Sequence, residues 1–253
     1  MTVDYEKHGH ICIMTFNNPE KRNALSVQDF LEMERIENDF AADDDAWVLI
    51  MTGAGDKSFC AGADLAEGVG AATSGSFMEP RYKRWFSHCY KPVVAAINGY
   101  ALAGGTELLE LADIRIAAEH AVFGLQEVRW GLVPLGGSCV HLTRQIPFCR
   151  AMELLLIGDR ISAQEALKYG LINKIVPKEE LMPTAMATAE RICENGPVAV
   201  RLVKEIALKS MGQPREIGYL MEDQIGAHAY TTEDAKEGPL AFFEKRKPNF
   251  KNR

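Results

Sequence analysis

The chain has 253 residues, of which 47% are hydrophobic and 25% are charged, as in an ordinary globular protein. This length fits one large domain, or one domain with a small appendage, and it can bury a core without disulfide or metal staples. With 28 Lys and Arg against 35 Asp and Glu, the formal net charge is −7. An acidic chain is poorly suited to nucleic acids or anionic membranes, because both bind basic surfaces.

Targeting and membrane segments are not evident in the sequence. No apolar run approaches the roughly 18 residues that a transmembrane helix needs, and the N-terminal region lacks the basic and apolar parts of a secretory signal. The six cysteines are scattered without a C-x-x-C pair, which is typical of free thiols in a reducing compartment. We therefore expect a cytoplasmic protein.

Short β-type runs alternate with helical runs in the first half of the chain. Residues 11–16 form an alternating, β-branched run that ends at the turn signal Asn17-Asn18-Pro19. Ser26 is a candidate N-cap for an amphipathic helix that extends to about Ala42. Further strands are predicted over 47–52, 93–97, 114–118 and 121–123. Strands that alternate with helices indicate an α/β protein with parallel pairing.

Helices dominate from Gly136 onward, and only residues 172–176 interrupt them as a strand. The predicted helices cover 137–146, 150–156, 163–169, 178–194, 197–211 and 215–230. The strongest helix breaker is Asn195-Gly196-Pro197, so we place a boundary there, between a core of residues 1–195 and a C-terminal region of residues 196–253. This region is too short to hold its own core and must pack on the body or on a neighbouring subunit.

Several common catalytic motifs are absent from the sequence. The segment 53–58 follows a predicted strand, but Asp56 stands where a phosphate-binding loop needs glycine before Lys-Ser. No G-x-G-x-x-G opens a helix in a dinucleotide-binding context, and no G-x-S-x-G is present. His8 and His10 have no third metal ligand in view. The sequence therefore argues against nucleotide-phosphate, serine-hydrolase and metal chemistry as functions of this protein.

Two segments rich in small residues follow buried strands, at residues 58–64 and 98–107. Small residues let a ligand approach the backbone closely. A helix that begins near Gly104 would direct its unpaired N–H groups, and the positive end of its dipole, at whatever binds there. This geometry suits an oxygen that gains negative charge during a reaction.

Two glutamates accompany these segments. Glu107 lies three residues after Gly104, on nearly the same helix face, and Glu127 follows the short strand predicted at 121–123. Two carboxylates that face one substrate can divide acid and base roles if their surroundings separate their pKa values. Taken alone, Glu107 is more often an ordinary first-turn helix acid, and Glu127 a residue of a solvated turn. The residues alone leave both alternatives open.

Six segments are diagnostic when taken in order. They are 18–25 (NPEKRNAL), 59–65 (FCAGADL), 91–99 (KPVVAAING), 131–137 (GLVPLGG), 158–163 (GDRISA) and 243–250 (FEKRKPNF). Over almost its full length, the chain resembles the crotonase, or enoyl-CoA hydratase/isomerase, superfamily. The resemblance implies an α/β fold, a spiral of ββα units with a C-terminal helical region that builds homotrimers, often paired into hexamers. This agrees with the boundary near Gly196.

The resemblance also implies a reaction. Family members bind acyl-coenzyme A and stabilise a thioester enolate in an oxyanion hole of two backbone N–H groups, matched here by Ala63 and Gly104. Members that hydrate carry two glutamates, matched by Glu107 and Glu127, and the single-glutamate isomerases usually lack the first. We therefore expect an enoyl-CoA hydratase, a lyase of fatty-acid or related acyl-CoA metabolism that adds water to, or removes it to form, a trans-2-enoyl thioester.

The expected roles of the glutamates, and the expected coenzyme A contacts, follow from the same resemblance. Glu107 would deprotonate the water that attacks the β-carbon, and protonated Glu127 would deliver the α-proton. The contacts would come from Lys21 and Arg22 at the phosphates, Ala24 along the pantetheine, and Ala61, Asp64 and Leu65 at the adenine end. No metal and no separate cofactor would be needed, because coenzyme A arrives with the substrate.

Two alternatives to hydration stay open at this point. The first is an isomerase, or a dehydratase that acts on a functionalised acyl group such as a carnitinyl thioester. The second is a non-enzymatic protein of the crotonase fold that associates with RNA. The net charge of −7 and the presence of both glutamates count against the second alternative.

Overall fold

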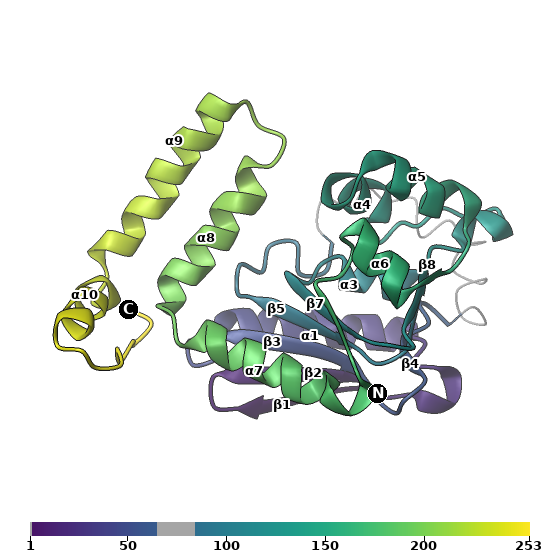
Figure 1. Cartoon of the computed structure of the whole chain (residues 1–253), viewed down its shortest axis with the longest axis horizontal. Coiled ribbons are helices and arrows are strands. Elements are labelled where there is room, and N and C mark those ends of the chain that lie inside the picture. Colours follow the sequence, from purple (N-terminus) through teal and green to yellow (C-terminus); the bar gives the residue numbers. More distant parts are fainter. Residues whose placement is uncertain (1, 65–83) are drawn as a thin grey trace.

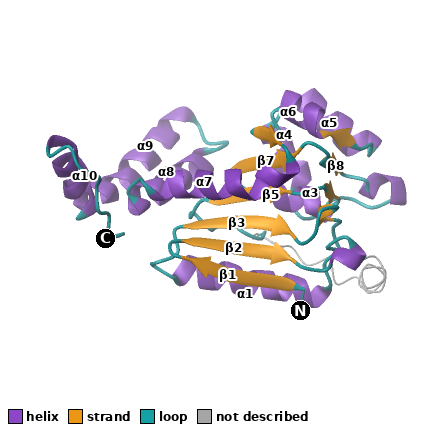
Figure 2. Cartoon of the chain, turned by 60° about the horizontal axis from the view of Figure 1, so that its bottom comes forward, coloured by secondary structure: helices purple, strands orange, loops and turns teal. Residues whose placement is uncertain are grey.

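The computed structural model describes residues 2–64 and 84–253. In this part of the chain two sheets, of six and four strands, carry the fold (Figure 2). The larger sheet has the spatial order β1 (Val3–His8), β2 (Ile11–Phe16), β3 (Val48–Gly53), β5 (Val93–Ile97), β7 (Ile114–Ala118) and β10 (Lys174–Val176). The smaller sheet has the order β4 (Ser58–Cys60), β6 (Tyr100–Leu102), β8 (Val122–Gly124) and β9 (Ile161–Ser162).

The chain contributes strands to the two sheets in turn. β3, β5 and β7 join the larger sheet, and each is followed by a short strand, β4, β6 or β8, in the smaller one. Successive strands of this series pair in parallel, with Ile50 opposite Val94 and Ala101 opposite Phe123. Helix α3 (Gly104–Leu109) follows β6, and α4 (Ser138–Gln145) comes after β8. This repeat is a spiral of ββα units, and it confirms the predicted α/β fold class.

Helices cover both faces of the larger sheet. On one face lies α1 (Val27–Ala42), which buries Met33, Ile36 and Phe40. On the other face α7 (Leu181–Cys193) packs on a second core that includes Ile50 and Val94. Because both faces are covered, the central strands are apolar throughout rather than alternating, which is why β3 and β5 could be recognised as buried runs.

The start of α1 agrees with the sequence prediction. The Ser26 hydroxyl accepts the Asp29 N–H at 3.1 Å, and the Asp29 carboxylate accepts the Ser26 N–H at 3.0 Å. This reciprocal capping box satisfies two N–H groups that an uncapped helix would leave unpaired.

Several predicted helices differ from the structure at their ends. The segment predicted from residue 178 begins as a 3-10 turn, η4 (Lys178–Glu180), before α7 starts. The segment predicted over 215–230 is α-helical only as α9 (Arg215–Gly226) and then tightens into η5 (Ala227–Thr231). The other helices of the second half are α5 (Phe148–Ile157), α6 (Ala163–Tyr169), α8 (Pro197–Ser210) and α10 (Asp234–Phe243).

The helices after Gly196 extend away from the sheets. α8 and α9 form a hairpin beside the body, with α10 beyond it (Figure 1). Lys204 attaches α8 to the body, since its Nζ donates to Asp113 Oδ2 at 2.7 Å and to the Lys91 carbonyl oxygen at 3.0 Å. Large apolar side chains of this region, Val203, Leu220 and Phe243 among them, are more than half exposed.

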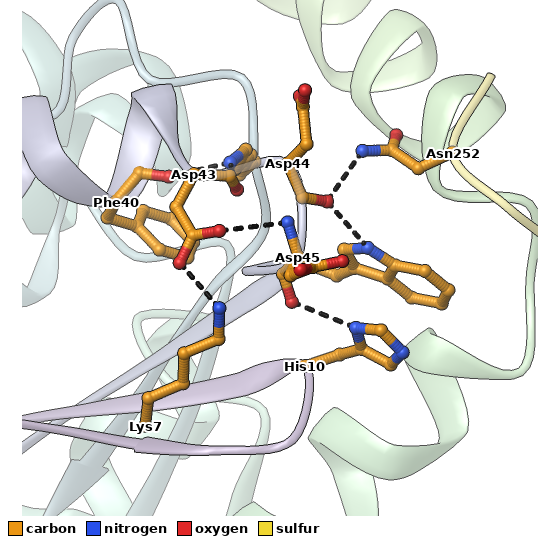
Figure 3. A network of polar contacts seen from close by, with 9 residues as sticks. Lys7, His10, Phe40, Asp43, Asp44, Asp45 and Asn252 are labelled. Atoms are coloured by element: carbon orange, nitrogen blue, oxygen red, sulfur yellow. Dashed lines mark hydrogen bonds and ion pairs between the residues drawn. The ribbon is translucent and has the colours of Figure 1, made fainter.

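The end of the chain returns to the loop before β3 (Figure 3). Asn252 Nδ2 donates to the Asp44 carbonyl oxygen at 2.7 Å, and the Trp47 indole N–H donates to the same oxygen at 3.0 Å. The His10 ring stacks on Trp47 with a centroid distance of 3.7 Å, and its Nδ1 lies 2.8 Å from the Asp45 carbonyl oxygen. The C-terminal residues are thereby fixed to the larger sheet.

Helix α3 and strand β4 meet backbone to backbone. A Cβ atom on Gly105 would overlap the carbonyl oxygen of Cys60, so only glycine permits this approach. The hydroxyl of Thr106 fastens the same helix to the smaller sheet, since it donates to the Ala101 carbonyl oxygen at 2.7 Å. The N-terminus of α3 is thus held against the segment that follows β4.

We predict that Gly105→Ala destabilises the protein by about 1–3 kcal/mol, because the methyl group has no space against backbone that cannot yield. For a chain of this length the melting temperature should fall by about 2–4 °C for each kcal/mol, as followed by circular dichroism. Gly218→Ala in α9 is the matched control, since its Cβ would lie at an ordinary 3.5 Å from Ser210 Cβ. Equal melting temperatures for the two variants would contradict the packing argument.

Candidate active site

Two backbone N–H groups lie side by side where α3 meets the segment after β4. The Cβ position of Gly62 lies 2.9 Å from the Gly104 nitrogen, and that of Gly104 lies 3.7 Å from the Ala63 nitrogen. The described residues supply neither the Ala63 N–H nor the Gly104 N–H with an acceptor. A pair of adjacent, uncommitted donors can receive one anionic oxygen.

Ala103, the residue before α3, has a strained backbone. Its φ of 51° and ψ of −123° lie in a region that residues with a Cβ rarely adopt, at a typical cost of about 1–3 kcal/mol. Its N–H donates to the Gly124 carbonyl oxygen at 2.8 Å, which fixes the turn to the end of β8. An alanine gives no sequence signal for such a conformation, so sequence reasoning did not find this residue.

Glu107 lies on α3 and accepts hydrogen bonds from the start of α4. Its Oε1 is 2.9 Å from the Gly137 nitrogen and 3.3 Å from the Ser138 nitrogen. A Cβ on Gly136 would stand 2.6 Å from Glu107 Oε2, so this glycine admits the carboxylate. Burial raises the pKa of Glu107, and the N–H donors oppose that rise.

Glu127 begins the 3-10 turn η3 (Glu127–Trp130) and is half-buried. Its Oε2 is buried without a hydrogen-bond partner among the described residues. Burial, with a smaller contribution from the nearby charge of Glu107, raises the pKa of Glu127 to about 7 against an opposing backbone hydrogen bond. The surroundings of the two glutamates therefore differ, because a helix N-terminus stabilises the anion of Glu107, whereas the uncompensated burial of Glu127 favours its protonated form.

A third glutamate, Glu110, lies behind this pair. It is 2% exposed, and its Oε1 accepts the Ser138 hydroxyl at 2.9 Å. The Cys139 thiol lies near all three acids. Partial burial is the largest cause that raises the pKa of this thiol, and the negative charges of Glu107, Glu110 and Glu127 raise it as well. Sequence reasoning missed Glu110, although its position three residues after Glu107 was a usable signal.

The residues expected to contact coenzyme A gather near the N-terminus of α1. Lys21 Nζ pairs with Asp64 Oδ2 at 2.7 Å, and the Ala61 N–H donates to the Arg22 carbonyl oxygen at 3.1 Å. Lys21, Ala24 and Asp64 share the lining of a cavity of about 130 Å³.

Arg22 and Leu65 belong to the same expected set of coenzyme A contacts. The Arg22 guanidinium lies 5.3 Å from the centroid of the Tyr100 ring, on β6, which keeps its charge on the side of the smaller sheet. Leu65, the last residue of the predicted set, lies outside the described residues.

Residues 2–64 and 84–253 contain neither a cluster of metal ligands nor a helix that could span a membrane. No group of three or more His, Cys, Asp or Glu side chains converges there in a way that could hold a metal ion. None of the helices in the same ranges combines the length and the apolar character needed to cross a bilayer.

Comparisons with known proteins agree with the geometry. A family model for enoyl-CoA hydratase/isomerase matches residues 6–253. The chain is 41% identical to enoyl-CoA hydratase EchA19 of Mycobacterium tuberculosis, covering 98% of this chain and 96% of that protein. It is 38% identical to a short-chain-enoyl-CoA hydratase of Clostridium acetobutylicum, covering 99% and 98%. A crystal structure of enoyl-CoA hydratase from Bacillus anthracis superposes with a TM-score of 0.92 at 39% identity over the whole of both chains. The chain belongs to the enoyl-CoA hydratase/isomerase family.

Proposed function

We propose that this protein is an enoyl-CoA hydratase, a hydro-lyase that adds water across the double bond of a trans-2-enoyl-CoA thioester or removes it. The observation that carries the proposal is the pair Glu107 and Glu127, two neighbouring glutamates of which the first accepts two backbone N–H groups and the second leaves a buried oxygen without a partner among the described residues. Relatives that are about 40% identical over nearly the whole chain are named as hydratases, which supports the same activity. An isomerase needs only one group that takes and returns a proton, so the second glutamate favours hydration.

In the proposed mechanism the thioester oxygen lies between the Ala63 and Gly104 N–H groups. These donors stabilise the negative charge that develops as the enolate forms. The Glu107 carboxylate takes a proton from the water that attacks the β-carbon, and the carboxylic acid of Glu127 gives a proton to the α-carbon. Glu107 gains one proton from water, and Glu127 loses one to the α-carbon. The two glutamates together therefore hold the same number of protons before and after the reaction.

For the coenzyme A moiety, which is part of the substrate, we propose contacts with the surface around the 130 Å³ cavity. Lys21 and Arg22 supply positive charge for phosphates, Ala24 admits the pantetheine, and the backbone at Ala61 and Asp64 borders the adenine. The ion pair between Lys21 and Asp64 holds the lysine at the edge of the cavity, so a phosphate would share Nζ with this carboxylate.

We also propose that the helices after Gly196 are an assembly module that builds a homotrimer or a hexamer. The exposed apolar side chains of α8, α9 and α10 support this proposal, since monomers rarely leave such surfaces to solvent. All six cysteines carry free thiols, which suits a reducing compartment such as the cytoplasm, where we place the enzyme.

The function is tested with Glu107→Gln and Glu127→Gln, assayed on trans-2-enoyl-CoA thioesters by loss of the conjugated thioester's ultraviolet absorbance. We expect each variant to lose about 10²–10⁴-fold in hydration, because each lacks one general acid or base. Exchange of the α-proton with solvent deuterium should survive in Glu107→Gln and stop in Glu127→Gln. Glu37→Gln, which changes a buried glutamate of α1, is the matched control with near-normal rates. Undiminished hydration by Glu107→Gln would refute the two-glutamate mechanism, and turnover of 3-enoyl thioesters without hydration of 2-enoyl thioesters would indicate an isomerase.

The oxyanion assignment is tested at Gly104. Gly104→Pro removes the N–H donor and should lower kcat by about 10²–10³-fold. Gly104→Ala keeps the donor, and its methyl group would stand 3.3 Å from Gly62 Cα, so we expect a much smaller loss. Full turnover by a folded Gly104→Pro variant would refute the assignment.

The assembly proposal is tested by ending the chain at Asn195 and by the paired change Val203→Glu with Leu220→Glu. Both should lower the mass measured by light scattering, because the first removes the apolar surface and the second places charge on it. A native assembly state in both proteins would show that subunits associate through another surface.

A further inference from the structure

Glu110 connects the two ends of helix α4. Its side-chain Oε1 accepts the hydroxyl of Ser138, the first residue of this helix, at 2.9 Å. Its backbone carbonyl oxygen accepts Nε2 of Gln145, the last residue of the helix, at 2.8 Å. The same carbonyl oxygen accepts Nη2 of the buried Arg115 at 2.8 Å, so Glu110 is itself firmly anchored.

Ser138 makes one hydrogen bond to each of two glutamates. Its backbone N–H points to Glu107 Oε1 at 3.3 Å, and its hydroxyl donates to Glu110 Oε1. It is fully buried, so water cannot replace either partner. Glu107 on α3 and Glu110, the residue that follows this helix, thus contact the same serine.

The turn before α4 contains two glycines, and Arg84 restrains its first part by donating Nε to the Leu135 carbonyl oxygen at 2.9 Å. Gly136 and Gly137 precede the helix, and Gly137, the N-cap residue, has a φ of 135° and provides no side-chain cap. Glycines leave the backbone its greatest conformational freedom. The N–H groups of Gly137 and Ser138 are aimed at Glu107 only if another contact restrains this turn, and the Ser138 hydroxyl supplies it.

We propose that Glu110 is a positioning residue, which acts through Ser138 to hold the N–H groups at the start of α4 on the Glu107 carboxylate. Because it assigns Glu107 the role of the base, this inference rests on the proposed function and deepens it. Glu110 touches neither the substrate nor the attacking water, and it acts by fixing the orientation and the acidity of the group that does.

The charges that face Glu110 come from several elements. Arg115 of β7 favours its anion, while Glu107 of α3 and Glu127 of η3 oppose it, and the Cys139 thiol of α4 lies in the same field. Burial is the largest influence and raises the pKa of Glu110 to about 8, in agreement with its buried, unpartnered Oε2. Glu110 is therefore mostly protonated near neutral pH, and a neutral replacement changes the geometry there with little change of charge.

The pH dependence of kcat/KM in a Glu110 variant tests this proposal. The acid limb of kcat/KM against pH reports the ionisation of the base in the free enzyme, and N–H donors to a carboxylate lower its pKa. Glu110→Met removes the acceptor of the Ser138 hydroxyl, so the donors drift from Glu107 and the acid limb should move upward by about half a pH unit or more. Near neutral pH, kcat should fall by about 10–100-fold, with KM nearly unchanged. The substrate is the trans-2-enoyl-CoA that the unmodified enzyme hydrates fastest.

Three further variants serve as comparisons for Glu110→Met. Glu110→Gln keeps an oxygen acceptor for Ser138 and should restore the acid limb to its normal position. Ser138→Ala should reproduce the effect of Glu110→Met, and the double variant should be no worse than either single one, as expected for residues that act in one chain of contacts. Glu37→Gln reports the cost of altering a buried glutamate elsewhere, with an unmoved limb.

An unmoved acid limb in Glu110→Met, or equal shifts in Glu110→Met and Glu110→Gln, would overturn the proposal. If Glu110→Met does not fold, Ser138→Ala decides alone, and an unmoved limb in it overturns the proposal too. A failure here with Glu107→Gln still inactive would leave the proposed function intact. Full hydration by Glu107→Gln would instead remove the function on which this inference rests.

Discussion

The backbone contact between Gly105 and Cys60 is the constraint on which the site depends. It joins two successive ββα units and leaves no space for a side chain between them. Because α3 is held this closely, the Gly104 N–H comes beside the Ala63 N–H, and the helix that provides one donor also carries Glu107 and is followed directly by Glu110. The donor pair, the proposed base and the proposed positioning residue are therefore placed by one packing contact, and the next unit of the spiral adds the proposed acid.

The three buried glutamates show how one small region can hold acids in different states. Glu107 receives two N–H groups from α4, Glu110 receives one hydroxyl, and Glu127 leaves a buried oxygen without a partner. The two N–H donors favour the anion of Glu107, whereas Glu110 and Glu127 each leave a buried oxygen without a partner among the described residues. Burial raises the pKa of Glu110 to about 8 and that of Glu127 to about 7, and mutual repulsion opposes ionisation of neighbouring acids. The donors that each carboxylate receives therefore support the acid and base roles proposed for Glu127 and Glu107.

Much of the fold could be predicted from the sequence, since the hydrophobic runs at 93–97 and 114–118 and the Ser26 cap depend on local chemistry. The ends of the later helices were harder to predict, because a 3-10 turn of three to five residues is too short for its period of 3.0 to be told from the 3.6 of an α-helix. α10 was missed, and it contains Pro239, which weakens its local signal. In the site, glycines and glutamates were visible as residue types. The strain at Ala103 and the partners of Glu110 arise from contacts between distant segments, which no local pattern encodes.

Several features of this site reduce stability, and they are adjacent. Ala103 is strained, α4 begins at a glycine without a side-chain cap, and Glu127 buries an unpaired oxygen. In another location each would be readily improved, for example by a capping side chain at position 137. Such a cap would compete with Glu107 for the N–H groups of α4, and a partner for Glu127 would alter its acidity. The two apolar cores around the larger sheet supply the stability that lets these costs persist. The proposed catalytic groups therefore retain the hydrogen-bonding capacity that a more stable fold would satisfy internally.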